Sequence, residues 1–386
     1  MSSAVTNALR PIYFVEVGAT QVQLGLIMTV PSLVSLLTRV PVSTLVNYLG
    51  RWRMMFFSII VSVGTTSLFA FVWDPILFFP LVGLAALAWA IYSPVALEFV
   101  SNQSTAEIRG SVMGVYFTSI AAALFIGPLL ASVLTIFLSI RQLFLFSFLF
   151  PVLALVVFLA ITRNSEMDGS EKIAPDSMDL NIVVSLSRIL RNRNFLAMCI
   201  ARIAFSISMG VFSTFYPVFA SEKLGLTASA ISLLFTFRGV TNMIIRIPAG
   251  RLSDRIGRRK PFIAAYMIII LTYVFLAYVK SFTLLAATMV LFGFGWGIRV
   301  APSMALISES VGDKDRTLAL SIFMTTFDLG TMIGALMVGF TGTVLSSEML
   351  LLVCVFIMSV ALTVVVLFSR ELRFPQPPDR DSRRHR

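Results

Sequence analysis

The stretch GRLSDRIGRR, residues 250–259, lies between two long apolar runs and has a counterpart 207 positions earlier in the chain. The counterpart reads STLVNYLGRW over residues 43–52 and also lies between two apolar runs. Gly50 matches Gly257 at this offset, and the arginine that follows is kept as well. Because glycine permits tight turns, both stretches are predicted to be short connections between buried helices.

The same offset, without gaps, relates residues in four apolar runs and their connections. Apolar composition alone does not place arginines and tryptophans at a fixed spacing, so the chain is predicted to be an internal duplication. The expected divisions are an N-terminal bundle (1–162), a cytoplasmic linker (163–194), a C-terminal bundle (195–368) and a basic cytoplasmic tail (369–386). The matched residues are Arg39 with Arg246, Pro41 with Pro248, Trp89 with Trp296, Arg109 with Arg316, and Gly127 with Gly334.

The composition places both halves in a membrane. Hydrophobic residues make up 58% of the chain and charged residues 13%, with a mean hydropathy of +0.92, too few polar groups to cover a soluble globule. A helix of roughly 20 apolar residues crosses the hydrocarbon core and satisfies its own backbone. We therefore predict an all-α polytopic membrane protein. The eleven full spans are expected at 24–45, 54–73, 77–99, 110–136, 143–162, 196–220, 228–248, 261–279, 282–307, 317–341 and 347–368.

The first segment, residues 1–17, is shorter than a span and polar in its first half. When the first segment is counted as the first span, the seventh span begins near Phe195. Its counterpart at the 207 offset would therefore begin about a dozen residues before Met1. We expect two pseudo-symmetric bundles of six helices, in which the first helix is truncated.

Basic residues indicate the orientation, because cytoplasmic connections are enriched in lysine and arginine. One set of connections, with the linker and the tail, carries nearly all basic residues outside the spans, whereas the opposite set carries Arg141, Lys223 and Lys280. Both termini of this cell-membrane protein are therefore expected in the cytoplasm. Topology accounts for the net charge of +11, so no nucleic-acid partner is expected. The basic tail faces solvent or contacts anionic membrane lipid, and we expect a monomer.

The sequence lacks the residues that several other functions need. Its two cysteines lie far apart in apolar runs, and its one histidine, His385, is next to the last residue. Neither a metal site nor an imidazole-assisted nucleophile is expected. No Gly-x4-Gly-Lys-Ser/Thr loop is present for nucleotide binding. We therefore expect no enzyme activity, no cofactor and no metal.

Residues 250–259 resemble the signature loop of the major facilitator superfamily: Gly, three residues, Asp, a basic residue, any residue, Gly and two basic residues. The pattern is complete here, and the helix number, the two halves and the linker extend the resemblance over the whole chain. The resemblance implies the fold of that family, secondary transport by alternating access, and a gating loop. The residues of this loop are Gly250, Asp254, Arg255, Gly257, Arg258 and Arg259, with Gly50 and Arg51 in the earlier copy.

In that family the loop acts as a cytoplasmic latch between the halves. Asp254 can accept hydrogen bonds from free amide groups at a helix N-terminus, where the helix dipole favours an anion. By symmetry we expect Asp254 near the start of the fifth span, around Arg109. The alternative is that the basic residues of the loop only fix the orientation of the chain in the membrane. The earlier copy has Asn47 in place of the acid.

The fifth span also resembles, in degraded form, the glycine pattern of proton-coupled exporters of the same family. That pattern has Gly, Gly nine residues later, Gly-Pro four residues after that, and then Gly-Gly. Gly114 and Gly127 remain here, whereas Ala123, Ala131 and Ser132 replace the other glycines. Small residues still allow close helix packing, and the pattern favours export slightly.

Charged residues within the spans mark the candidate pathway, because they are costly in lipid and usually face a cavity or a partner. Arg238, Arg299 and Asp328 lie near mid-depth of the eighth, tenth and eleventh spans. We expect an ion pair there, which leaves the other arginine for a carbonyl or an anionic substrate group. Arg202 lies about two turns into the seventh span, and Arg10 about two turns from the outer end of the first.

Asp328 is also the candidate proton carrier. Burial favours a neutral carboxyl group and a nearby arginine favours the charged one, so movement between conformations can switch its proton. A permanent Asp–Arg brace is the alternative. Trp89, Tyr92 and Trp296 are candidate pocket residues, and the two tryptophans occupy equivalent positions of the fourth and tenth spans. Rings on membrane helices serve packing more often than ligand binding.

These features predict a secondary active transporter that moves a small-molecule substrate, with protons as the coupling ion. The leading hypothesis is proton-coupled efflux of small amphipathic compounds. The alternative is proton-coupled uptake of an organic anion or metabolite, favoured by the excess of arginine over Asp328. A non-transporting membrane sensor on the same scaffold is the alternative of another class.

Overall fold

The computed structural model describes residues 1–102, 109–164, 182–312, 315–342 and 344–368, in which the regular elements are helices. It confirms the all-α prediction, with eleven helices long and apolar enough to cross a membrane among the described residues. The elements up to residue 164 are α1 (Ser2–Thr6), α2 (Arg10–Glu16), α3 (Gln21–Leu49), α4 (Arg51–Phe69), the short 3-10 helix η1 (Pro75–Leu77), α5 (Phe78–Asn102), α6 (Arg109–Leu134), α7 (Ile140–Ser147) and α8 (Leu149–Asn164). The later elements are α9 (Ile182–Arg191), α10 (Arg193–Glu222), α11 (Ala228–Ile256), α12 (Arg259–Tyr278), α13 (Phe282–Ser310), α14 (Arg316–Thr341) and α15 (Ser347–Phe368).

Two of the expected membrane segments are divided. The first segment forms α1 and α2, and the sixth span forms α7 and α8. Pro11 lies in the first turn of α2 and Pro151 in the first turn of α8. Proline has no N–H to bond the carbonyl four residues earlier, so each break falls where that bond is lost. The expected linker also contains a helix, α9; the domain divisions themselves stay a prediction.

The duplication is visible in the backbone. Among the described residues, four glycines have positive φ, and they form two pairs at the 207 offset. Gly18 and Gly225 have φ of 102° and 64°. Gly50 has φ 84° and ψ 148°, and Gly257 has φ 87° and ψ 156°. Residues with a side chain are strained in this region, so both loops keep glycine where the chain turns between helices.

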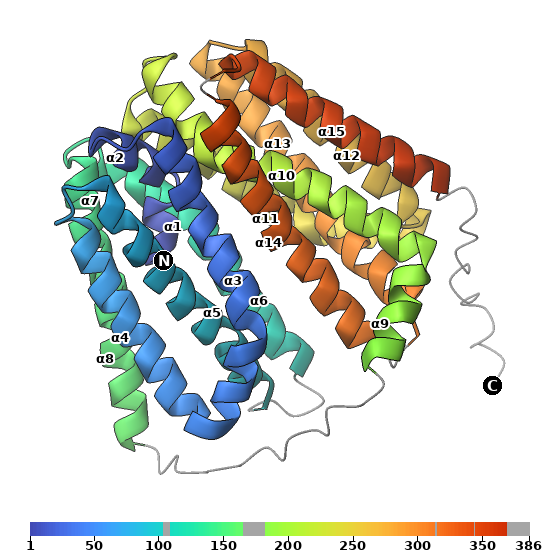
Figure 1. Cartoon of the computed structure of the whole chain (residues 1–386), viewed down its shortest axis with the longest axis horizontal. Coiled ribbons are helices and arrows are strands. Elements are labelled where there is room, and N and C mark those ends of the chain that lie inside the picture. The colour runs from blue at the N-terminus through green and yellow to red at the C-terminus, as the bar shows by residue number, and fades with distance from the viewer. Residues whose placement is uncertain (103–108, 165–181, 313–314, 343, 369–386) are drawn as a thin grey trace.

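The helices run alternately between two ends of the molecule. We call the end where α8 finishes and α10 begins the linker end, and the opposite end, where α3 and α11 begin, the far end (Figure 1). The helices up to α8 lie on one side and those from α10 onward on the other. The two sides meet along α3 with α14 and along α6 with α11. These two pairs are equivalent under the 207 offset, as a pseudo-twofold arrangement requires.

The two sides are in contact at the far end. Gly25 of α3 lies against the Gly339 backbone of α14, where an added Cβ would come within 2.5 Å of the Gly339 Cα. Gly239 of α11 lies similarly close to the Leu124 backbone of α6. One buried core contains far-end residues of both sides, among them Phe14, Phe78, Phe212 and Val338.

At the linker end the two sides separate. A second, smaller core belongs to the first side alone and includes Val42, Met54 and Val95. Leu37 of α3 is 67% exposed, and Ile247 of α11 is 68% exposed. The paired helices therefore diverge from the far end toward the linker end, as the ribbon also shows (Figure 1).

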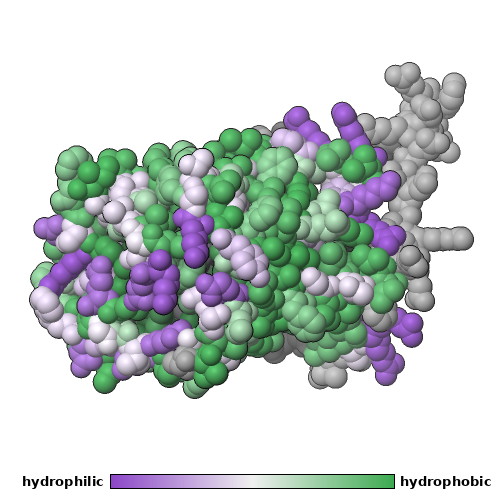
Figure 2. All heavy atoms as spheres, turned by 90° about the horizontal axis from the view of Figure 1, so that it is seen from above, coloured by the Kyte–Doolittle hydropathy of each residue, from purple (hydrophilic) through white to green (hydrophobic). Residues whose placement is uncertain are grey.

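The outer surface suits a membrane protein. Seen from above the view of Figure 1, apolar side chains cover most of this face, and hydrophilic side chains gather in patches (Figure 2). Many large apolar side chains are exposed, including Phe137, Phe340 and Phe356. Such exposure is favourable in hydrocarbon and costly in water.

Candidate functional site

The candidate site begins at a contact between α3 and α14 near the depth at which the two helices diverge. Asp328, near the middle of α14, accepts a hydrogen bond of 3.0 Å from the Ser35 hydroxyl of α3. One turn toward the far end, the hydroxyls of Ser32 and Thr331 lie 2.9 Å apart. One turn toward the linker end, Met324 of α14 is 37% exposed. Asp328 thus lies at the boundary between the sealed and the open parts of the interface.

Arg202 of α10 lies behind this boundary. Its guanidinium carbon is 4.6 Å from the ring centre of Phe323 and 5.1 Å from that of Phe327, both on α14. One nitrogen, Nη2, lies 3.6 Å from the sulfur of Met324. The Asp328 carboxylate is near enough to stabilise the Arg202 charge. The side chain is only 9% exposed, and its Nε–H has no hydrogen-bond partner.

Arg299 of α13 is buried more deeply, at 2% exposure. Its guanidinium lies 3.8 Å from the ring centre of Phe205 on α10 and beside the hydroxyl of Tyr266 on α12. That hydroxyl donates to the Ala201 carbonyl at 2.7 Å, which fixes the ring against α10. The buried Nε and Nη1 of Arg299 have no partner. Arg299 and Arg202 are also close enough to repel each other.

Arg238 of α11 has a different environment. Four aromatic rings surround its guanidinium, at 4.5–5.7 Å from the guanidinium carbon to the ring centres. Cation–π contacts of this kind stabilise a desolvated cation. The rings belong to Phe212, Phe235, Phe292 and Trp296.

The structure therefore groups the predicted charges unevenly. The Asp328 carboxylate lies close enough to stabilise the charge of Arg202, which lies next to Arg299, whereas four aromatic rings surround Arg238. We predicted a pairing of Asp328 with Arg238 or Arg299 at mid-depth. The described side chains add two interactions of Asp328 to that prediction: the hydrogen bond from Ser35 and the proximity to the charge of Arg202.

Of the remaining predicted pathway residues, Arg10, Trp89 and Tyr92 belong to the first side, whereas Trp296 lies next to Phe205, the ring beside Arg299. Arg10 donates from Nε to Thr6 at 3.3 Å and lies 5.6 Å from the Phe69 ring centre, within the first side. Trp89 is 58% exposed and stacks on Tyr92 at 6.4 Å. Trp296, its equivalent in the repeat, instead packs on Phe205 and Phe292. The two tryptophans thus have different surroundings.

The predicted gating loop lies at the linker end of α11. Asp254 accepts a 2.9 Å hydrogen bond from Arg258 within the loop, and its side chain is 65% exposed. Arg259 donates to the Val366 carbonyl of α15 at 3.4 Å. The side chain of Arg109 lies outside the described residues, so the expected approach of Asp254 to that position stays a prediction.

The three glycines of the predicted loop take positions that need no side chain. Gly257 ends α11 and Gly50 precedes α4 with the matching positive φ. Gly250 lies within α11, and a Cβ added to it would lie 3.8 Å from the Cβ of Ala301. Arg255 is exposed, and Arg51, at the start of α4, is half-buried and takes part in a polar interaction.

Sequence reasoning missed the hydroxyl contacts between the sides. Besides Ser35 and Thr331, Ser229 of α11 donates to the Ser132 carbonyl of α6 at 2.7 Å, and the two hydroxyls are 3.3 Å apart. Serine is common in membrane helices, and only the folded geometry shows which serines face the other side. The exporter-like pattern of α6 named Ser132 only as a small residue.

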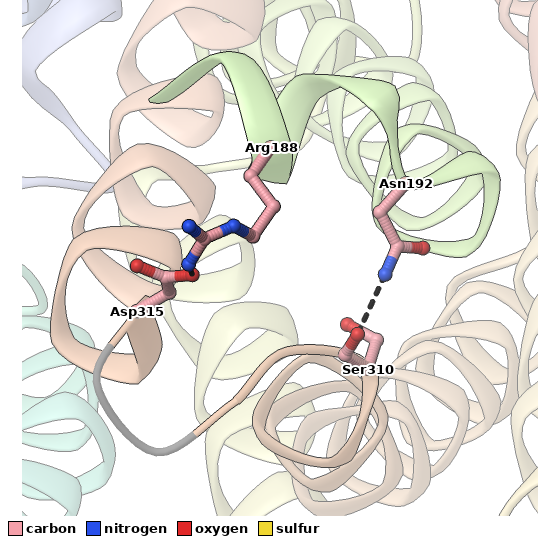
Figure 3. Close-up of polar contacts among 4 residues, drawn as sticks. All are labelled: Arg188, Asn192, Ser310 and Asp315. Atoms are coloured by element: carbon pink, nitrogen blue, oxygen red, sulfur yellow. Dashed lines mark hydrogen bonds and ion pairs between the residues drawn. The ribbon is translucent and has the colours of Figure 1, made fainter. Parts of the chain in front are cut away.

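A second group of polar contacts joins α9 to the linker end of the second side (Figure 3). Arg188 forms an ion pair with Asp315 at 3.1 Å, and Asn192 donates to the Ser310 carbonyl at 2.6 Å. Asn192 also accepts from the amides of Asn194 and Phe195, which caps the start of α10. The expected linker is therefore partly fixed to the connection between α13 and α14.

The geometry defines a polytopic membrane protein with two related helix bundles and a charged site between them. Comparison with known proteins agrees: the model of the Major Facilitator Superfamily matches residues 1–219 and 195–385, and the chain belongs to this family of membrane transporters. Within the described residues, no group of three or more His, Cys, Asp and Glu side chains is placed to hold a metal ion.

Among curated relatives, an uncharacterized MFS-type transporter of Methanocaldococcus jannaschii is 22% identical over 87% of this chain and 86% of its own length. The staphylopine export protein of Staphylococcus aureus is 22% identical over 97% and 93%. The multi-drug resistance efflux pump PmrA of Streptococcus pneumoniae is 26% identical over 64% and 61%.

Solved structures show the same fold. A point mutant of the nucleoside transporter NupG superposes with a TM-score of 0.77 at 12% identity over 95% of each chain. A bacterial homolog of the human lysosomal transporter Spinster, in an inward-facing and occupied conformation, gives 0.77 at 13% identity over 96% and 94%.

Proposed function

We propose that this chain is a secondary active transporter of the cell membrane that exports a small amphipathic solute in exchange for protons. It acts as a monomer by alternating access around the site at Asp328. The observation that carries this proposal is that the two sides touch at the far end, separate at the linker end, and are joined between these ends by the contact of Ser35 with Asp328. A transporter in one of its two end states has this form.

The charge distribution supports an orientation. Basic residues gather at the linker end, including Arg251, Arg255 and Arg258 near the end of α11. The positive-inside rule then puts this end and both termini in the cytoplasm, so the conformation is open to the inside. The loop at Asp254 would close this end in the other state.

Asp328 is the proposed coupling residue. Its hydrogen bond from Ser35 comes from the opposite side of the molecule, whereas the charge of Arg202 belongs to its own side. Rocking of the sides changes the first contact more than the second. The carboxylate would therefore be stabilised differently in the two states, which is the requirement for taking up and releasing a proton.

The direction rests on two observations. The fifth span keeps part of the exporter pattern, and two relatives are named for export and multidrug efflux. The excess of arginine over Asp328 favours the second candidate, proton-coupled uptake of an organic anion or metabolite. A sensor would bind solute without moving it.

Flux in proteoliposomes separates these functions. Purified full chain is reconstituted with the linker end inside or outside, the orientation being determined by protease access, and a pH gradient is imposed while a panel of amphipathic solutes is followed. Exchange moves solute against the proton flow, and cotransport moves it with the proton flow. No solute movement in either gradient would contradict the transporter assignment and leave the sensor.

Cross-linking tests the alternating access itself. Cysteines at Ser132 and Ser229, whose hydroxyls are 3.3 Å apart, would form a disulfide that locks the far end. The two native cysteines, Cys199 and Cys354, are buried, which lowers the background. We expect oxidation to stop transport and reduction to restore it. Transport that continues in the oxidised protein would contradict the mechanism.

A further inference from the structure

The pair Arg202 and Arg299 has more hydrogen-bond donors than the surrounding protein satisfies. Arg202 Nε, Arg299 Nε and Arg299 Nη1 are buried and have no partner. Buried polar groups are nearly always bonded, and a charged donor without a partner is costly. Three such donors on two neighbouring side chains therefore need an explanation other than packing.

The electrostatics of the pair point the same way. The two guanidinium groups lie close enough to repel each other, and the Asp328 carboxylate lies close enough to stabilise the Arg202 charge. For Arg299 the stabilising neighbour is the Tyr266 hydroxyl, which is neutral. One carboxylate thus faces two permanent positive charges, because arginine keeps its proton. Taken together, Arg202, Arg299 and Asp328 therefore carry a net positive charge within the described part of the chain.

Met324 lies between Arg202 and the open end of the interface. Met324 touches Arg202 Nη2 and is itself 37% exposed where α14 diverges from α3. Methionine is flexible and adapts its shape easily. A solute that enters from the linker end and displaces this side chain meets Arg202 first and Arg299 behind it.

We propose that Arg202 and Arg299 bind the anionic group, a carboxylate or phosphate, of the transported solute, with the rings of Phe205, Phe323 and Phe327 against its apolar part. This rests on the proposed transport function and adds the charge class of the solute. Guanidinium groups bind carboxylates and phosphates through two parallel hydrogen bonds, so three free donors on two arginines suit one such group.

Arg238 provides the matched control. It is also a mid-membrane arginine of the second side with one unpartnered buried nitrogen, Nη1. Its charge, however, is enclosed by four rings. Replacement of Arg238 therefore alters a buried cation without touching the proposed anion site.

The test compares four probes that share one ring system: 1-naphthoate, 1-naphthyl phosphate, the neutral 1-naphthamide and the cationic 1-naphthylmethylamine. Each is titrated against purified full chain in nanodiscs, with thermal unfolding and probe fluorescence as readouts. We expect the two anions to bind at least about tenfold more tightly than the neutral and cationic probes, as charge-assisted hydrogen bonds predict. Equal binding of all four probes, or no binding of the anions, would overturn the proposal.

The variants locate the site. Arg202→Gln and Arg299→Gln should abolish the preference for anions, and Arg238→Gln should keep it. Arg202→Lys and Arg299→Lys preserve the charge if a glutamine variant does not fold, and should weaken the preference through loss of the bidentate geometry. An anion preference unchanged in the lysine variants would overturn the proposal. Anion binding without any flux would instead contradict the proposed transport function and leave this site in place.

Discussion

Ser35 on α3 and Asp328 on α14 share a 3.0 Å hydrogen bond although they are 293 residues apart in the chain. The bond joins the two sides of the molecule at the depth where their helices begin to diverge. Asp328 also lies on the helix that carries Phe323 and Phe327, the rings beside Arg202. A single carboxylate is therefore in contact with the other side and electrostatically linked to its own.

Asp328→Asn tests the charge without removing the acceptor. The asparagine oxygen can still accept from Ser35, but the side chain cannot carry a proton at neutral pH. We expect transport driven by a pH gradient to fall to background while solute–solute exchange across the membrane continues. Ser35→Ala is the control, because it removes the hydrogen bond and keeps the charge, and it should slow transport while keeping the dependence on pH. The same pH dependence in Asp328→Asn and the native chain would exclude Asp328 as the coupling residue.

Gly25→Ala tests the seal at the far end. The new methyl group would come within 2.5 Å of the Gly339 backbone and 2.7 Å of the Ala335 carbonyl oxygen, so α3 and α14 must move apart. We expect a loss of about 1–3 kcal/mol in the stability of this conformation, the usual cost of overpacking. Labelling of a cysteine placed at the far end should increase. Gly64→Ala in α4 is the control, since nothing lies within 4 Å of its Cβ. Its helix should gain up to about 1 kcal/mol. Equal effects of the two variants would contradict the close approach.

The equivalent turns at Gly50 and Gly257 give a test of the duplication. Alanine at either position must adopt φ near +85°, which costs about 1–2 kcal/mol for a residue with a Cβ. Both variants should lower the thermal unfolding midpoint by similar amounts, although nothing lies within 4 Å of either added Cβ. Gly312→Ala, also in open space and without a positive φ, should leave the midpoint nearly unchanged. A large loss at one turn and none at the other would contradict their equivalence.

Asn192→Ala should destabilise the protein more than Arg188→Gln. Asn192 caps α10 and bonds the Ser310 carbonyl, so its loss removes contacts worth about 1–2 kcal/mol. Arg188 is 65% exposed, and its ion pair with Asp315 is worth at most about 1 kcal/mol after solvent screening. Thermal unfolding of the two variants in the same detergent checks the order. The reverse order would show that the ion pair, rather than the cap, holds α9 in place.

Most of the fold could be predicted from the sequence, because hydrophobic length and the 207-residue offset are properties of the chain itself. All eleven expected spans correspond to helices or, for the sixth, to the pair α7 and α8. The breaks at Pro11 and Pro151 were missed, since proline lies inside several other helices here without dividing them, as Pro128 does in α6. Whether a helix bends or breaks depends on neighbours that the sequence does not place.

The site was predicted less completely. Depth along a helix follows from counting residues, so the sequence places Arg202, Arg299 and Asp328 within the spans, and their role in the pathway stays a prediction. Which way each one faces depends on helix rotation and on the packing of the two sides. That is why Ser35 was missed and why Arg238, which has a similar sequence context, is enclosed by rings instead. Helix α9 was missed because a short amphipathic segment between charged residues has the composition of a linker.

The far-end seam includes two contacts between small groups: the backbones at Gly25 and Gly339 and the hydroxyls of Ser132 and Ser229. At these two contacts no long side chain from one side inserts into the other, so the small groups can separate along their surfaces. What is lost on separation is mainly dispersion between closely spaced atoms, which falls off within an ångström or so. Contacts of this kind are favourable when the two sides are packed together and contribute almost nothing once the sides have separated. The molecule is therefore expected to populate its end conformations and to pass quickly between them.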